Sequence, residues 1–207
     1  MKLYEINYKN MHDEKILKYI EKFSNSIKER VELFSKKGIM QWQSDYAERN
    51  SVNEIVHKME VWNNITLLVF CDSATDEFIA GAFLKGSERP GYWDEYVEDR
   101  KLEDWYELNL NKKCAYISGL VTNNKFKGTN LGKTIIRELA KYCKSKNIEL
   151  MRLDCYVLDE KDSFLFNFYK KVGFKCVGGG RKVKQPPIVD YVYRLFEADV
   201  EDIVADI

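Results

Sequence analysis

Residues Phe126 to Ile136 read FKGTNLGKTII and separate an apolar stretch from an amphipathic one. Gly128 and the run Gly132-Lys133-Thr134 resemble a Walker A nucleotide loop, G-x-x-x-x-G-K-[ST], that is one residue too short. A loop between a strand and a helix leaves the first N–H groups of the helix unpaired, and the helix dipole adds to their attraction for phosphate. The stretch therefore indicates an anion-binding loop, although an ordinary helix cap with exposed lysines explains the same residues.

ATP fits this loop poorly. A loop shortened by one residue cannot form a Walker A phosphate nest of the usual size. No apolar strand that ends in a single aspartate stands out as the partner for magnesium that a P-loop enzyme needs. A P-loop kinase is therefore a distant alternative.

The composition excludes several classes of protein. The 207 residues carry 33 basic and 33 acidic side chains, so the strongly basic surface of a nucleic-acid-binding protein is not expected. The five cysteines are scattered and form no C-x-x-C pair, and the two histidines lie far apart in the sequence. We therefore expect no metal site. Apolar runs are too short to span a bilayer, so we expect a cytoplasmic protein without a membrane partner.

Hydrophobic periodicity predicts an α/β domain with a mixed sheet. Apolar residues from Ile16 to Phe34 recur every three or four positions, which predicts a long helix that ends at Gly38. Ser51-Val-Asn-Glu54 is a capping-box pattern that opens a second helix. The remaining predicted elements are strands at 2–8, 65–71, 77–85, 114–121, 150–157, 174–177 and 189–195, and helices from 130 and over 163–171.

Two motifs point to one family. Residues 127–132 follow the pattern [QR]-x-x-G-x-[GA], with Lys127 in the first place and Asn130 in place of the middle glycine. Residues 162–174, DSFLFNFYKKVGF, meet N-x-x-L-x-x-F-Y-x-x-x-G-F, with Asp162 where asparagine is usual. Over residues 115–178 the sequence resembles the GNAT acetyltransferase superfamily, and the long first helix is similar to that of its bacterial small-molecule members.

The resemblance implies a fold and a function for each part of the chain. We expect a single α/β domain over 1–207, with a mixed central sheet of about seven strands flanked by about four helices. Two adjacent parallel strands, Ala115–Val121 and Leu150–Val157, are expected to splay apart at the cofactor site. The expected parts are a cofactor-binding core at about 113–180, acceptor-side helices at about 13–62, and an acidic aromatic insertion at about 87–111.

The resemblance also implies acetyl-CoA as the acyl donor. In such a site the loop holds the pyrophosphate, and backbone groups of the first splayed strand pair with pantetheine like an added strand. Asn130 is a mild change, because asparagine adopts left-handed backbone angles more readily than most residues do. The residues expected to bind the cofactor are Leu120, Val121, Lys127, Gly128, Thr129, Asn130, Leu131, Gly132, Lys133 and Asp162.

By the same resemblance, Tyr169 protonates the departing thiolate. A phenol remains protonated at neutral pH, which suits that role. On spacing alone a core tyrosine is the better explanation, and the match to the family motif favours the acid. No carboxylate lies on the strand face of Cys114, Tyr116 and Ser118, so we assign no general base. Asp154 could act through water, but a structural role explains it at least as well, and an amine with a modest pKa needs no strong base.

The sequence therefore predicts an N-acetyltransferase that acts on the primary amine of a small molecule, with no metal. Acceptor walls are expected from the loop 38–50, which contains Trp42 and Tyr46, and from the loop 178–187. The acidic insertion suits an amine, but a solvated acidic surface explains it as well. The alternatives are a protein N-terminal or lysine acetyltransferase and a non-catalytic CoA-binding module. We expect no nucleic-acid partner and allow for a homodimer.

Overall fold

The computed structural model describes residues 1–39, 42, 44–87, 101–104, 107, 111–126, 129–157, 164–184 and 189–205. Its contacts divide the chain into two compact units. The first comprises Met1–Lys85 and Ile117–Gly132, and the second comprises Gly86–Tyr116 and Lys133–Ile207. Strand β5 (Cys114–Thr122) contributes residues to both units.

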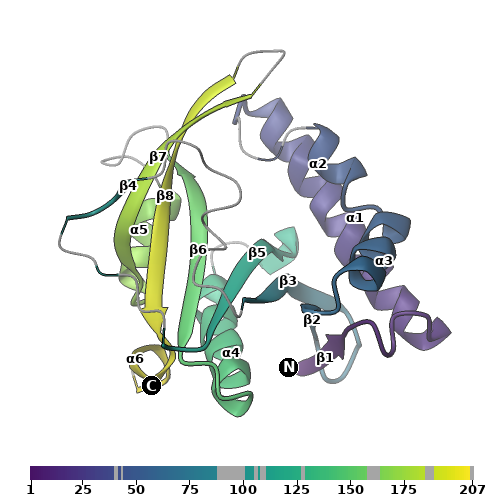
Figure 1. Cartoon of the computed structure of the whole chain (residues 1–207). Helices are drawn as coiled ribbons and strands as arrows, with labels where there is room; N and C mark the ends of the chain where they lie inside the picture. The colour runs from purple at the N-terminus through teal and green to yellow at the C-terminus, as the bar shows by residue number, and fades with distance from the viewer. Residues whose placement is uncertain are drawn as a thin grey trace. The chain divides into compact units, whose positions relative to one another are not determined.

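The first unit contains a three-stranded antiparallel meander and three helices. In β1–β2–β3, Leu3 pairs with Phe70, and Leu68 pairs with Ala82. Figure 1 shows the long helix α1 alongside α2 and α3, which it contacts. The elements are β1 (Lys2–Ile6), α1 (Glu14–Lys36), α2 (Ser44–Glu48), α3 (Val52–Val61), β2 (Ile65–Cys71) and β3 (Phe78–Ser87).

The stripe predicted for the first helix is the side of α1 that faces the core. Ile20, Phe23 and Ile27 are completely buried, because apolar residues three and four positions apart lie on one face of a helix. They pack with apolar residues of α3 and the meander in one cluster. Asp13 caps α1 by accepting a hydrogen bond from the Lys15 backbone N–H (2.8 Å).

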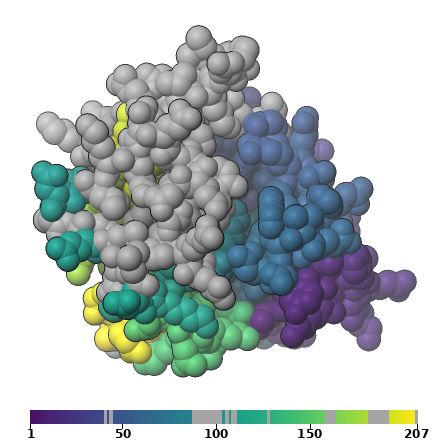
Figure 2. Space-filling model, viewed as in Figure 1, coloured from purple at the N-terminus to yellow at the C-terminus, as the bar shows by residue number. Residues whose placement is uncertain are grey.

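Both predicted helix boundaries in this region hold, but one for a different reason. Gly38 has φ +65° just after α1, as the sequence predicted for a left-handed glycine. Ser51 is the N-cap of α3, yet its side chain makes no capping hydrogen bond. The capping-box pattern therefore gave the right boundary without forming the predicted bond. Helix α3 lies on the outer surface of the first unit (Figure 2), and Val61 and Trp62 at its end are exposed.

The turn between β2 and β3 is held by one carboxylate. Asp76, at φ +57°, accepts hydrogen bonds from the hydroxyls of Tyr4 (2.7 Å) and Tyr19 (3.0 Å). Lys18 Nζ lies 3.1 Å from its Oδ2, and Lys22 Nζ donates to its backbone carbonyl (2.6 Å). The hydrogen bond from Tyr4, followed by that from Lys18, lowers the pKa of Asp76 well below its ordinary value. These bonds join β1 and α1 to the hairpin.

The second unit is built on an antiparallel group of strands with helices beside it. β6 pairs with β8, β8 with β7, and β7 with the short β4. Helix α5 contacts β6 and β7 and lies behind β7 and β8 in Figure 1. The elements are β4 (Lys101–Leu102), α4 (Leu131–Ser145), β6 (Leu150–Val157), α5 (Phe164–Lys171), β7 (Lys175–Lys184), β8 (Val189–Asp199) and α6 (Val200–Ala205).

Hydrogen bonding orders eight strands of the described chain as β1-β2-β3-β5-β6-β8-β7-β4. Cys114–Tyr116 of β5 pair with Leu150–Arg152 of β6 in parallel, and the other described pairings are antiparallel. The predicted mixed sheet and its parallel pair are thereby confirmed. The short elements α2, α6 and β4 were not predicted, and the strand predicted at 174–177 extends to Lys184 as β7. The splay of the parallel pair stays a prediction.

Candidate functional site

The end of β5 is fixed by hydrogen bonds within the first unit. The Asn123 side chain donates to the Phe78 carbonyl (2.9 Å), and its backbone N–H donates to the Ile79 carbonyl (2.8 Å). Arg30 of α1 donates to the Thr122 carbonyl (2.9 Å) and to Asn124 Oδ1 (3.1 Å). The phosphate-loop candidate therefore begins from an anchored position.

Gly119 lies within β5 and has a left-handed backbone, at φ +62°. A Cβ at this position would lie 3.2 Å from Phe83 Cδ2 and 3.3 Å from Tyr46 Oη. Only glycine combines this φ with so close an approach of neighbouring side chains. Gly119 was not predicted as a site residue, although an isolated glycine inside an apolar strand is a recognised signal for a bulge.

The loop before α4 also contains a left-handed residue. Asn130 has φ +55° and is exposed, directly before the first residue of α4, Leu131. This conformation explains why asparagine replaces the glycine of the motif. Thr129 Oγ1 donates to the Phe126 carbonyl (2.6 Å), which closes the preceding turn. The first four N–H groups of α4 lack acceptors within the helix, as in any helix, and so can bind an anion.

The other residues predicted for the cofactor fall into three groups. Val121 is buried in the core of the first unit, so its side chain is used for packing and only its backbone is available to a ligand. Leu120, Leu131, Gly132 and Lys133 are half-buried. Lys127, Gly128 and Asp162 lie outside the described residues.

Tyr169 is a buried residue of α5 in the second unit. It is 8% exposed, and its ring lies 5.7 Å from that of Phe174 and 5.6 Å from that of Phe196. Burial, followed by the nearby Cys155 and Asp154, raises the pKa of the Tyr169 hydroxyl. The phenol is thus protonated at neutral pH.

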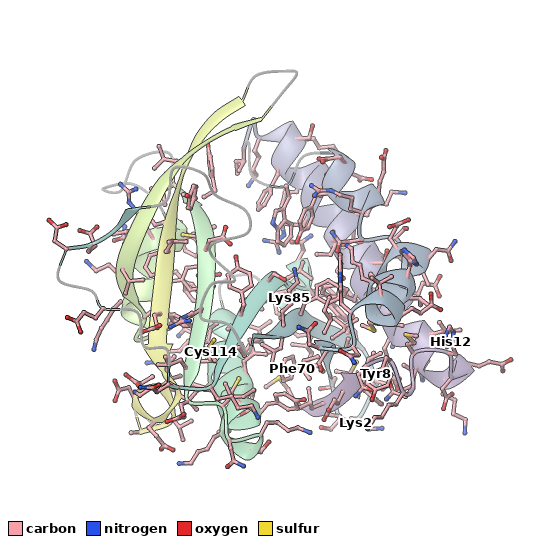
Figure 3. All side chains as sticks on the ribbon, viewed as in Figure 1. Lys2, Tyr8, His12, Phe70, Lys85 and Cys114 are labelled. Carbon is pink, nitrogen blue, oxygen red and sulfur yellow. The ribbon has the colours of Figure 1, made fainter. Side chains whose placement is uncertain are left out.

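The start of β5 offers no general base. Cys114 (Figure 3) is buried, and burial raises the pKa of its thiol, so it is a thiol at neutral pH. Its Sγ accepts a hydrogen bond from Arg152 Nη1 (3.5 Å). Arg152 is only 2% exposed, and its Nε donates to Glu197 Oε2 (2.6 Å). This buried ion pair was not predicted from the sequence, because 45 residues separate its partners.

Aromatic rings gather in the predicted acceptor loop of the first unit. Trp42, with φ +51°, stacks on Tyr46 at a centroid distance of 4.8 Å and an interplanar angle of 10°. Phe34 of α1 extends this group, with its ring 5.9 Å from that of Trp42. Since a Cβ on Gly119 would lie 3.3 Å from the Tyr46 hydroxyl, this loop lies against β5 at Gly119.

Part of the acidic insertion is described. β4 adds to the edge of β7 through Lys101 and Leu102, and the Glu103 N–H donates to the Val177 carbonyl (2.9 Å). Glu103, Asp104 and Glu107 are exposed, as a solvated acidic surface would be. The other insertion residues at 88–100, 105–106 and 108–110 lie outside the described part of the chain.

Among the described residues, no group of three or more histidine, cysteine or acidic side chains is arranged to hold a metal ion. No described helix is both long enough and apolar enough to cross a membrane.

The chain matches a known protein family. The family model described as "Acetyltransferase (GNAT) family" matches residues 37–174. No curated protein matches the sequence.

Solved structures with similar folds cover nearly the whole chain. One is an acetyltransferase of the GNAT family from Listeria monocytogenes, with 18% identity, a TM-score of 0.57, and coverage of 96% of this chain and 94% of that one. A spermidine N-acetyltransferase variant from Vibrio cholerae has 15% identity, a TM-score of 0.54, and coverage of 99% and 98%. An aminoglycoside 6'-acetyltransferase has 14% identity, a TM-score of 0.54, and coverage of 97% of both chains. At these identities the likeness shows the fold.

Proposed function

Because this chain belongs to the acetyltransferase (GNAT) family, whose model matches residues 37–174, we propose that it transfers an acetyl group from acetyl-CoA to a primary amine of a small molecule. The observation that carries the proposal is the left-handed Asn130 at the start of α4. It lies where the family motif has glycine, and the N–H groups of the following helical turn suit a pyrophosphate.

We assign the binding of acetyl-CoA to backbone groups and to the lysines of the loop. Backbone groups of Leu120 and Val121 would pair with the pantetheine arm. The loop from Lys127 to Lys133 would hold the pyrophosphate, and Asp162 would lie beside the cofactor. The burial of the Val121 side chain supports a backbone role for that residue. Gly119 supports the assignment further, because its left-handed backbone lies directly before Leu120 and Val121 in β5.

Tyr169 is proposed as the general acid. Acetyl-CoA supplies a thioester whose acetyl carbon accepts the amine nitrogen and whose C–S bond then breaks, with the electron pair left on sulfur. Tyr169 donates its proton to that sulfur, and its raised pKa supports this protonation state. Water takes the proton that the amine loses and returns one to Tyr169.

A small-molecule acceptor is favoured over a protein. Two proteins of similar structure are acetyltransferases of spermidine and of aminoglycosides, which are small amines, although the likeness itself extends only to fold. The stacked Trp42 and Tyr46 beside Gly119 support an aromatic acceptor wall. All five cysteines lie in the described part of the chain, none of them forms a disulfide there, and four are buried, which supports action in a reducing cytoplasm.

The proposal is tested by ligand-dependent stability and then by turnover. Acetyl-CoA and CoA should each raise the melting temperature through the linkage relation RT ln(1 + [L]/Kd), whereas Mg-ATP should not. A panel of small amines should then release CoA thiol in the presence of acetyl-CoA. A response to Mg-ATP alone would overturn the donor assignment. Acetyl-CoA binding without thiol release for any amine or peptide would favour the non-catalytic alternative.

A further inference from the structure

The backbone of Leu120–Val121, which is assigned to the pantetheine arm, lies between two points at which β5 contacts other parts of the first unit. Before this segment, a Cβ on Gly119 would lie 3.3 Å from the Tyr46 hydroxyl, so the acceptor loop lies against β5 there. After it, the Thr122 carbonyl accepts a hydrogen bond from Arg30 of α1 (2.9 Å). The part of β5 assigned to the donor is therefore held at both ends.

The second of these contacts comes from one guanidinium group. Arg30 Nη2 donates to the Thr122 carbonyl and also to Asn124 Oδ1 (3.1 Å), because a guanidinium nitrogen carries two N–H groups. Arg30 thereby joins the last residue of β5 to the short 3₁₀ helix η2 (Asn124–Phe126), which leads into the loop from Lys127 to Lys133. Burial lowers the pKa of the Arg30 guanidinium, which reflects the cost of taking this charge out of water.

Arg30 also lies over an aromatic ring of its own helix. Its Cζ is 5.8 Å from the ring centroid of Phe34, one helical turn further along α1, and the Phe34 ring lies 5.9 Å from that of Trp42. The Phe34 backbone fixes the start of the acceptor loop, because its carbonyl accepts a hydrogen bond from the Ile39 N–H (2.9 Å), just after the left-handed Gly38. Phe34 thus connects Arg30 with the acceptor loop.

The acceptor loop returns to β5 through stacked rings. Trp42 stacks on Tyr46 with ring centroids 4.8 Å apart, and Tyr46 lies against Gly119. Asn50, which is only 4% exposed, fixes Tyr46, since its side chain donates to the Tyr46 carbonyl (2.7 Å). These contacts form a closed circuit within the first unit, which we name the β5 clamp. Its members, in order, are Arg30, Phe34, Trp42, Tyr46, Gly119 and Thr122.

We infer that Arg30 is a positioning residue for the binding of acetyl-CoA, and that the β5 clamp couples the donor site to Trp42 of the acceptor loop. The inference rests on the proposed function for the identity of the donor. Arg30 acts through the backbone of Leu120–Val121, because its hydrogen bonds fix the residues that follow this segment. Coupling between two sites is reciprocal, so a change at Trp42 alters donor affinity as a change at Arg30 does.

The first test measures CoA affinity by calorimetry, without an acceptor. Arg30→Met keeps an unbranched side chain that favours helix and removes both hydrogen bonds, so we expect the Kd for CoA to rise about ten-fold. Arg30→Lys keeps one donor group and should recover part of that affinity. Lys28→Met removes an exposed charge from the same helix and should change the Kd by less than about two-fold. A lower melting temperature for Arg30→Met with an unchanged Kd would show a structural arginine and overturn the inference.

The second test measures the coupling itself. Trp42→Leu and the double variant with Arg30→Met complete a thermodynamic cycle for CoA binding. If the β5 clamp acts as one unit, the double variant loses no more affinity than the more affected single variant, whereas losses that multiply would overturn the coupling. Saturating CoA should also change tryptophan emission in the wild type, and this change should be lost in Trp42→Leu and reduced in Arg30→Met.

The third test needs no ligand. Hydrogen exchange of the free protein should be about ten-fold faster at residues 120–124 in Arg30→Met, with little change in β2, because the clamp holds only the end of β5. Equal exchange at 120–124, or a uniform increase that includes β2, would overturn the inference. CoA binding that depends on Arg30, without thiol release for any amine or peptide, would support the inference and contradict the proposed function. A wild type that binds no CoA would contradict both.

Discussion

Gly119→Ala is expected to destabilise the first unit by an amount that can be worked out from its surroundings. An L-residue at φ +62° costs about 1–2 kcal/mol relative to glycine. The added Cβ would also lie 3.2 Å from Phe83 Cδ2, and Phe83 packs edge-on against Phe23 with ring centroids 5.1 Å apart. Since that ring has little room to move, overpacking adds about 1–2 kcal/mol. The expected loss is therefore about 2–4 kcal/mol.

Gly38→Ala provides a matched control. Gly38 has φ +65°, but a Cβ there would meet no atom within 4 Å, so this variant should lose only the conformational share of about 1–2 kcal/mol. In a chain of this size 1 kcal/mol changes the melting temperature by about 2–4 °C. Calorimetric or fluorescence melts should therefore show a loss of about 4–16 °C for Gly119→Ala and about half of that for Gly38→Ala. Equal losses would refute the close contacts, and no loss at Gly119 would refute the left-handed backbone.

Three further outcomes are expected. Tyr169→Phe should lower the single-turnover rate of thiol release by about 10²-fold with little change in acetyl-CoA affinity, whereas lower stability with normal turnover would show a structural tyrosine. Gly128→Val should weaken CoA binding in calorimetry far more than it lowers the melting temperature, and equal affinity would remove the loop from the site. Asp76 has a depressed pKa, so its stabilising contribution is present above the unfolded pKa of about 4 and is lost as pH falls below it. The urea midpoint of the wild type should therefore exceed that of Asp76→Asn at pH 7, and this difference should shrink toward pH 3. A difference that does not change with pH would contradict a lowered pKa of Asp76 in the folded protein.

Local patterns predicted the elements well. The stripe from Ile16 to Phe34 gave α1, because helical periodicity is a property of neighbouring residues. The substitution of asparagine at position 130 was read correctly as compatible with a left-handed angle, since that tolerance belongs to the residue itself. Short elements such as β4 and α6 escaped prediction because two to six residues carry too little periodic signal.

Long-range features could not be read from the sequence. The buried Arg152–Glu197 pair depends on the pairing of β6 with β8, and neither residue is unusual in its own segment. The hydrogen bonds of Arg30 to Thr122 and Asn124 likewise depend on tertiary packing, because both partners lie far from Arg30 in the sequence.

Transfer of a labelled acetyl group tests the central claim most directly. The protein is incubated with acetyl-CoA that carries ¹³C in the acetyl group and with the panel of small amines, and the products are analysed by mass spectrometry alongside thiol release. We predict one labelled acetyl group on the nitrogen of a small amine, in equal amount to the CoA released. Binding of acetyl-CoA with no labelled small amine would contradict the account, and label recovered only on peptide amines would favour a protein acetyltransferase instead.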